Sequence, residues 1–415
     1  MDIAGTVSRL NILSLAKLTL LLMIFGLFTI DNRGVLNVAT GLMVILSLYQ
    51  VRKENINIKN AIGDFLKKRK SLVVFSLWCI VCIAFFTYKN EVKDAFNLFF
   101  KDWRYPFVLF LFFVSFNKDI LVLRRIYVVG AIFTLTYIIM AVPVIRYIKD
   151  APQPLYLQLR YGFAFYVVML FPFALVGAVL IKKIYMKMML AVVSFSAFIF
   201  LLYTGSRGGI LALAVEAAII FFICVKNIKA LALVLLSVAV ITGAGLTLAY
   251  NTFPQVKHKI DQSTHLANIT SGRDKIITGR YPLVMYSMKN AIFGIGYGNS
   301  TFDAYLIDHN APKNGGVFNW KTKKYNLDEP LFLTVLYNIG FGGLILFVAS
   351  MAIVLKDMVQ SVKTEKNIFN VSLLASFIGY FLVYCLFEKT FMEIYFLYSI
   401  MALIFASKYN NQRDE

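Results

Sequence analysis

The sequence has few charged residues and long stretches that contain none. Only 15% of its 415 residues are charged, whereas 59% are hydrophobic. The apolar runs are repeatedly about 17–25 residues long, which is the length of an α-helix that crosses a ~30 Å hydrocarbon core. This composition excludes a water-soluble domain and predicts an all-α, polytopic membrane protein.

Cysteine and histidine are also scarce. All four cysteines lie inside apolar runs, and Cys79 with Cys82 forms a single C-x-x-C that has no second pair and no histidine nearby. We interpret the cysteines as packing residues and not as a metal or redox site. The three histidines lack the spacing of metal ligands. We therefore expect no metal and no cofactor.

Acidic residues are half as numerous as basic ones, 22 against 42, and the formal charge is +20. In a soluble protein this excess would raise the question of nucleic acid. Here most basic residues lie in short loops between apolar segments, where positive charge marks the cytoplasmic side and contacts anionic lipid. We expect membrane lipids as partners and no nucleic acid.

No internal repeat and no low-complexity tract is evident. Because no small-residue cleavage site follows the first apolar segment, we expect that segment to be a retained first span. The hydrophobic pattern predicts about twelve spans, with both termini on one side. Their expected positions are 12–30, 35–50, 71–88, 105–117, 126–148, 161–181, 188–203, 209–225, 231–250, 331–355, 368–387 and 391–407.

This pattern divides the chain into membrane helices over 1–250, one large loop over 251–330, and membrane helices with a short cytoplasmic tail over 331–415. The basic loops are predicted to be cytoplasmic by the positive-inside rule. The other loops, 31–34, 89–104, 149–160, 204–208, 251–330 and the turn at Glu388, are predicted to face the periplasm. Residues 56–70 are either an amphipathic helix on the cytoplasmic surface or a solvated loop.

The large loop is the expected place of chemistry, because a membrane protein seldom keeps so long a polar insert without a function. Its first part, 251–270, is polar and irregular. From Arg280 we predict one helix, with Pro282 in its first turn and Gly294 as its stop. The three alternating glycines of 294–298 have no strand before them and no clear helix after them. We interpret them as a tight turn and not as a nucleotide-binding loop.

Arg207 lies between two apolar segments that almost no loop separates, so its guanidinium is expected at the outer membrane surface. A charge there is costly unless it is paired or functional. One interpretation is snorkelling to lipid headgroups or an ion pair with Glu388. The other is an anion site, because guanidinium donors match phosphate oxygens and the adjacent glycines permit close backbone approach.

Arg280, Arg273 and Arg160 are candidates to complete that anion site. Arginines that converge at a membrane surface suit a lipid-linked pyrophosphate, whose negative charge rises as it leaves. The alternative is that Arg273 and Arg280 are solvated or bind lipid headgroups. For a general base the candidates are Glu329, which follows Asp328 where the chain re-enters the membrane, and His309. Glu329 is otherwise a helix cap.

Four pieces in order resemble the O-antigen ligase and polymerase family of bacterial inner-membrane glycosyltransferases. They are the Ser-Arg-Gly-Gly of 206–209 at the start of a span, Arg280 before an apolar helix, the glycine run of 291–299, and the Asn-Ile-Gly-Phe-Gly-Gly of 338–343. Length and span number match as well. The family commonly has His-Asn where this sequence has Glu329-Pro330, which places the identity of the base in question.

The resemblance implies a bacterial inner-membrane protein whose active site faces the periplasm. It implies metal-independent transfer of O-antigen from undecaprenyl pyrophosphate to an outer-core sugar of lipid A–core, with Arg207 and Arg280 on the pyrophosphate. The close alternative is an O-antigen polymerase that uses the same donor. A lipid-linked glycan transporter or flippase is the alternative from another class, although transporters usually show repeat symmetry and broken helices near the midplane.

Overall fold

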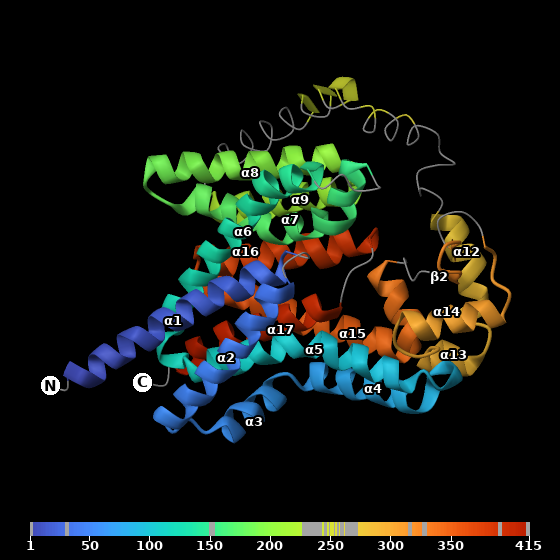
Figure 1. Cartoon of the computed structure of the whole chain (residues 1–415), viewed down its shortest axis with the longest axis horizontal. Helices are drawn as coiled ribbons and strands as arrows, with labels where there is room; N and C mark the ends of the chain where they lie inside the picture. Colours follow the sequence, from blue (N-terminus) through green and yellow to red (C-terminus); the bar gives the residue numbers. More distant parts are fainter. Residues whose placement is uncertain are drawn as a thin grey trace.

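The computed structural model describes residues 3–29, 33–148, 154–225, 273–313, 318–325, 330–388 and 392–411, with a few single residues and short pieces between 243 and 261. Helices make up nearly all of these residues (Figure 1). The long helices are α1 (Ile3–Leu27), α2 (Arg33–Lys53), α4 (Lys70–Phe86), α5 (Val92–Ser115), α6 (Ile120–Ile148), α7 (Leu155–Leu180), α8 (Ile184–Thr204), α9 (Arg207–Cys224), α15 (Leu331–Thr364) and α17 (Met392–Asn411). The shorter elements are α3 (Ile58–Lys68), η2 (Tyr88–Asn90), η3 (Asn117–Asp119), α16 (Ile368–Phe377), the π-turn η5 (Ile378–Val383) and η6 (Tyr384–Leu386).

Seven of the described helices are long and apolar enough to cross a membrane, and an eighth span is obtained if α3 and α4 are counted together. The prediction of an all-α polytopic membrane protein is therefore confirmed. The number of twelve spans is not confirmed. Apolar parts of α1 and α17, Ile12–Leu27 and Met392–Ala402, are shorter, and the predicted span at 231–250 lies outside the described ranges.

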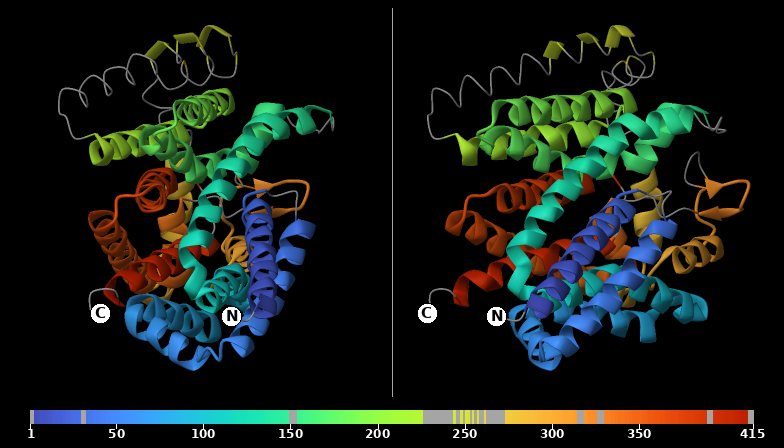
Figure 2. Two further views of the ribbon diagram at one scale, coloured as in Figure 1. Left: turned by 90° about the vertical axis from the view of Figure 1, so that its left-hand side faces the viewer. Right: turned by 60° about the vertical axis from the view of Figure 1, so that its left-hand side comes forward.

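The bundle is built around α7 and the C-terminal helices. Beyond Arg160, α7 is apolar on all faces and contacts α6, α8, α9 and α16, which is the expected position for a helix without a polar side. In Figures 1 and 2 the green helices α7–α9 lie on one side, the blue helices α3 and α4 on the opposite side, and the red C-terminal helices between them. Contacts of α15 with α4, and of α17 with α5, join these layers.

The expectation of a loop over 89–104 is wrong. After the short turn η2, helix α5 begins at Val92 and continues through that stretch into the predicted span. The reason is an apolar stripe at helical spacing, with Ala95, Phe99 and Leu109 all buried, while charged residues between them, such as Lys93 and Lys101, are exposed. The charged residues between these apolar positions made the stretch resemble a polar loop, although its apolar residues repeat at helical spacing.

Within 56–70, residues Ile58–Lys68 form helix α3, as one of the two interpretations of that stretch expected. α3 begins after Asn57, whose side chain accepts a hydrogen bond from the backbone N–H of Asn60 at 3.1 Å. It meets α4 at an angle of 89°. Arg69 at the corner is 2% exposed and forms an ion pair with Asp357 of α15, which ties the bend to the bundle. Helix α3 thus lies at a right angle to a span, the orientation of an interfacial helix.

The insert also differs from the prediction of one helix that begins at Arg280. Arg280 lies within α12 (Arg273–Val284), so Pro282 falls near the end of that helix and not in its first turn. A second helix, α13 (Met288–Phe293), begins after Ser287, whose hydroxyl accepts from the backbone N–H of Asn290 at 3.1 Å. Gly294 ends α13, as predicted. The stretch 251–270 lies almost wholly outside the described residues.

The carboxyl of Glu216 on α9 packs directly against Gly379 of the π-helical segment η5. Glu216 is fully buried on α9. A Cβ placed on Gly379 of η5 would come within 2.1 Å of Oε1 of Glu216. No side chain is therefore tolerated at position 379 while the carboxyl keeps this place. A carboxyl so deep in an apolar bundle is costly.

Candidate active site in the polar insert

The insert folds into a small lobe with its own hydrophobic core at one end of the bundle (Figure 1). Besides α12 and α13 it contains α14 (Asn299–Asp308) and a hairpin of β1 (Phe318–Asn319) with β2 (Lys324–Tyr325). The expectation that no helix follows the glycine run is wrong, because α14 starts directly after Gly298. The core of the lobe includes Phe302 of α14, Tyr325 of β2 and Tyr337 of α15.

Arg280 lies in this core and is only 3% exposed. Its guanidinium carbon is 5.2 Å from the ring centroid of Phe302 and 5.8 Å from that of Tyr325. Both distances allow attraction between the cation and the aromatic rings, which strengthens when the group is desolvated. Sequence placed Arg280 correctly in the insert, but it gave no indication that aromatic rings from α14 and β2 would fix the guanidinium.

The glycine run is a joint between the lobe and the span α15. The backbone N–H groups of Ile295 and Gly296 donate to the carbonyls of Tyr337 and Asn338, at 2.9 and 3.1 Å. These carbonyls lie just before a break in α15 at Gly340, which has φ 68° and ψ −174°. The broken helix therefore regains part of its hydrogen bonding from the loop, as a backbone group at membrane depth requires.

Glycine is required on both sides of this joint, because the two backbones touch. A Cβ on Gly294 would lie 2.4 Å from the carbonyl carbon of Asn338. A Cβ on Gly340 would lie 2.2 Å from the carbonyl oxygen of Ile292. The interpretation of a tight turn that permits close backbone approach is confirmed, and the partner is the chain itself.

A second tie to the lobe was missed by sequence reasoning. Tyr297, in the glycine run, donates its hydroxyl to Oδ2 of Asp102 on α5 at 2.7 Å, and both residues are buried. Burial, followed by the neighbouring carboxylate, raises the pKa of the Tyr297 hydroxyl, which therefore remains a donor. The signal was available: Asp102 falls on the buried stripe of α5 between Phe99 and Pro106, where an acidic residue is unexpected.

His309, the rival base, lies at the end of α14. Its Nδ1 is 2.8 Å from the carbonyl oxygen of Tyr305, and its ring stacks on that of Tyr305 at 4.0 Å. The adjacent Asp308 accepts from the Tyr88 hydroxyl at 2.8 Å and pairs with Lys89. These hydrogen bonds hold the pKa of Asp308 below its usual value, with Lys89 as the larger cause. His309 itself is exposed, so its ring is accessible from outside the lobe.

Arg207 and Arg160 belong to a different cluster, at the ends of α9 and α7. Ser206 caps α9 by accepting from the backbone N–H of Gly209 at 3.3 Å, and Arg207 in the first turn is exposed. Arg160 forms an ion pair with Glu388 at 2.9 Å. The start of α9 and the Arg160–Glu388 pair are in contact at Gly208, since a Cβ there would lie 3.7 Å from Cγ of Glu388.

The structure thus brings the Arg207 end of α9 beside the Arg160–Glu388 pair and places Arg280 in the insert lobe. Arg273 begins α12. Glu329 and Asp328 lie outside the described residues, and α15 begins immediately after Pro330. In the part of the chain that the structure describes, no three His, Cys, Asp or Glu side chains are grouped so that they could hold a metal ion.

Comparison with known proteins gives one match. A family model described as O-antigen ligase matches residues 192–348. The matched segment begins in α8 and includes α9, the insert and α15 beyond the break at Gly340. No curated protein matches the chain. The family implies a glycosyltransferase-like membrane enzyme of O-antigen assembly. Residues 192–348 are thus similar to the O-antigen ligase family.

Proposed function

We propose that this protein is an O-antigen ligase of the bacterial inner membrane. It transfers O-antigen polysaccharide from undecaprenyl pyrophosphate to an outer-core sugar of lipid A–core, at the periplasmic face and without a metal. The observation that carries the proposal is the family match, because residues 192–348 include both Arg207 and Arg280 together with the lobe that joins α15.

In the proposed step the acceptor hydroxyl oxygen attacks the anomeric carbon of the donor sugar. The bond from that carbon to the pyrophosphate oxygen breaks, and the pyrophosphate leaves with the electron pair and one additional negative charge. A base takes the hydroxyl proton. Groups that hold the leaving pyrophosphate more tightly than the bound donor lower the barrier.

Arg207 is well placed for this role. Its guanidinium is exposed in the first turn of α9, where the backbone N–H groups and the helix dipole also favour an anion. Gly208 and Gly209, which follow Arg207, are buried, and glycine at 208 lets this end of α9 pack closely against Phe387. We assign Arg207 to direct contact with the pyrophosphate. Arg160, which pairs with Glu388 beside the start of α9, is assigned to the edge of the same pyrophosphate site.

Arg280 is assigned to the same pyrophosphate from the insert, with Arg273 as a further substrate contact. Because Arg280 is 3% exposed in this conformation, the proposal requires the lobe to open when donor binds. Its contacts with Phe302 and Tyr325 keep the guanidinium oriented until then. Glu329 is assigned as the base, with His309 as the alternative base or a substrate contact.

The test uses purified protein in detergent with lipid-linked O-antigen, lipid A–core acceptor and EDTA, and follows product size on a gel. Wild type is expected to join glycan to lipid A–core. Arg207→Ala and Arg280→Ala are expected to lose about 10²–10³-fold in rate, the usual effect of removing one donor from a developing anion. Arg52→Ala, an exposed arginine at the end of α2, is the matched control and keeps full activity.

Three results would contradict the proposal or part of it. Glycan that lengthens on its lipid carrier would identify an O-antigen polymerase. A folded protein that yields neither product but moves the donor across a vesicle membrane would identify a transporter. If Glu329→Gln stays active while His309→Gln does not, His309 is the base.

A further inference from the structure

A groove lies between α6 and α8, away from the insert. Its volume is about 700 Å³, and it is open along its length to the surroundings of the bundle. The walls are apolar side chains of α6, α8 and the start of α16. The lining side chains are Arg124, Arg125, Val128, Val129, Ile132, Phe133, Thr136, Ile181, Met186, Met189, Leu190, Glu365, Asn367, Ile368 and Phe369.

The groove has the length of one membrane leaflet. Its wall on α6 runs from Arg124 to Thr136, and twelve steps of about 1.5 Å give roughly 18 Å. Half of a ~30 Å hydrocarbon core is about 15 Å. Val129 and Phe133 on this wall are 56% and 60% exposed, although no polar group covers them. An acyl chain of one leaflet fits both the length and the chemistry of the wall.

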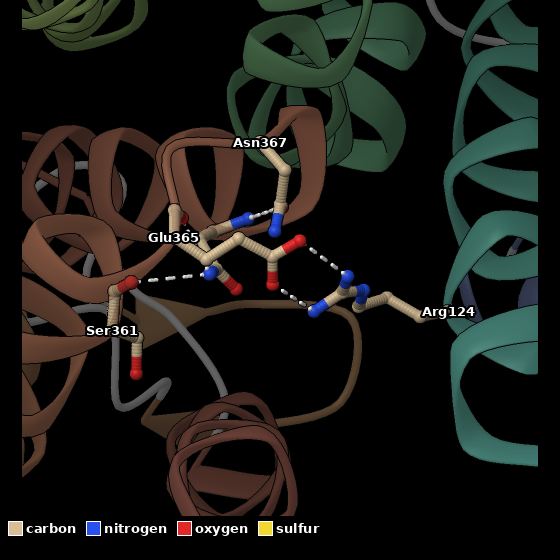
Figure 3. A network of polar contacts seen from close by, with 5 residues as sticks. Arg124, Ser361, Glu365 and Asn367 are labelled. Carbon is tan, nitrogen blue, oxygen red and sulfur yellow. Dashed lines mark hydrogen bonds and ion pairs between the residues drawn. The ribbon is translucent and has the colours of Figure 1, made fainter. Parts of the chain in front are cut away.

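The charged residues of the groove gather at one end. There Arg124 donates two hydrogen bonds to the carboxylate of Glu365, each 3.0 Å, across the turn between α15 and α16 (Figure 3). The turn is fixed because the side chain of Asn367 caps α16 through the backbone N–H of Asn370 at 2.9 Å. The bidentate pair neutralises the one acidic group of the lining.

With Glu365 neutralised, Arg125 supplies the unbalanced charge at this end. It is exposed, and the adjoining turn between α7 and α8 carries Lys182 and Lys183, which are also exposed. Apart from the Glu365 carboxylate, which is paired with Arg124, the charged groups that a headgroup would meet here are positive. An apolar slot of leaflet length under a basic rim is the pattern of an anionic-lipid site between membrane helices.

We propose that this groove binds one anionic glycerophospholipid of the surrounding leaflet, with its phosphate at Arg125 and one acyl chain along α6. The basic rim places the groove at the end of the bundle predicted to be cytoplasmic, opposite to the proposed transfer site. The inference does not depend on the proposed function, since it rests on the groove and its charges alone.

The experiment measures lipid binding to the purified full chain by native mass spectrometry, with titration of phosphatidylglycerol and, separately, phosphatidylcholine. Phosphatidylglycerol is expected to bind at one site and more tightly. Arg125→Ala should weaken phosphatidylglycerol about fivefold, since one basic residue near a lipid surface contributes about 1 kcal/mol. Lys356→Ala, an exposed lysine of α15 outside the lining, should change nothing.

The groove itself is tested with a pair of matched substitutions on α6. Val129→Trp fills the groove and should abolish the tight site, whereas Val144→Trp is the control. Both valines are 56% exposed, and only Val129 lines the groove. Both variants are compared after confirming that they melt at the wild-type temperature. Neither valine is buried enough for a tryptophan in its place to prevent folding.

Three outcomes would overturn the proposal. Equal binding of phosphatidylglycerol and phosphatidylcholine would show that the groove takes any acyl chain without selecting the headgroup. Equal effects of the two tryptophan substitutions would show that the lipid binds outside the groove. Displacement of phosphatidylglycerol by a polyprenyl pyrophosphate, with loss of that displacement in Val129→Trp, would show that the groove is a donor site. Full transferase activity in Val129→Trp together with lost lipid binding separates this inference from the proposed function.

Discussion

The sharpest prediction concerns the glycine joint between the insert and α15. We expect Gly340→Ala to detach the lobe from the span. At φ 68° and ψ −174° the backbone occupies a region that is essentially restricted to glycine, and any other residue costs about 1–3 kcal/mol there. The added Cβ would also lie 2.2 Å from the carbonyl oxygen of Ile292, so the loop must move.

Movement of the loop breaks the two hydrogen bonds from Ile295 and Gly296 to α15, each contributing about 1 kcal/mol. The sum is about 3–5 kcal/mol, which raises the open population of the joint by a factor of roughly 2 × 10² to 5 × 10³. The measurement is amide hydrogen exchange of residues 292–298 in detergent, with limited proteolysis of the lobe beside it.

The matched control is Gly41→Ala in α2, where an added Cβ would meet nothing within 4 Å. There the change should be neutral or stabilise the helix by about 0.5–1 kcal/mol. If Gly340→Ala and Gly41→Ala gave the same exchange rates and the same melting temperature, the joint would not hold the lobe and the reasoning would be refuted.

Two further predictions concern ion pairs. Asp308 has its pKa lowered by Lys89 and Tyr88, so the stabilisation is present above the ordinary value of about 4 and is lost as pH falls through the lowered value. Wild type should exceed Asp308→Asn in melting temperature at pH 6, and the difference should vanish with acidification; a constant difference would contradict this. Arg160→Leu removes the 2.9 Å ion pair with the partly buried Glu388 and should destabilise the fold by about 1–3 kcal/mol, whereas adding Glu388→Gln should restore part of the loss. Additive losses in melting temperature would show that the pair is not coupled.

Much of the scaffold could be predicted because its signal is local. The runs that form α7 and α15 are apolar for longer than a membrane is thick, so their place as membrane helices follows from composition alone. The start of α15 at Leu331 was likewise predicted from the hydrophobic pattern, and the stop of α13 at Gly294 from the backbone preference of a single glycine. Where charges interrupt a helical stripe, as in α5, the same local reading was wrong.

The candidate site was predicted only as a set of residues and a region. Sequence identified Arg207, Arg280 and the glycine run, because a guanidinium at a membrane surface and three alternating glycines are unusual in themselves. It could not show that Arg207 shares a cluster with Arg160, since the contact with Glu388 joins residues 228 positions apart. Such a contact is decided by how the helices pack.

Sequence by itself therefore determined that this is a helical membrane protein with one polar insert, because hydrophobic length and backbone preference act within a few turns of chain. Only the tertiary structure decided that the insert is a packed lobe, that Arg280 lies between rings from α14 and β2, and that the glycines face the broken α15. The physical reason is that these features arise from desolvation and backbone contact between distant segments, and neither quantity exists until those segments meet.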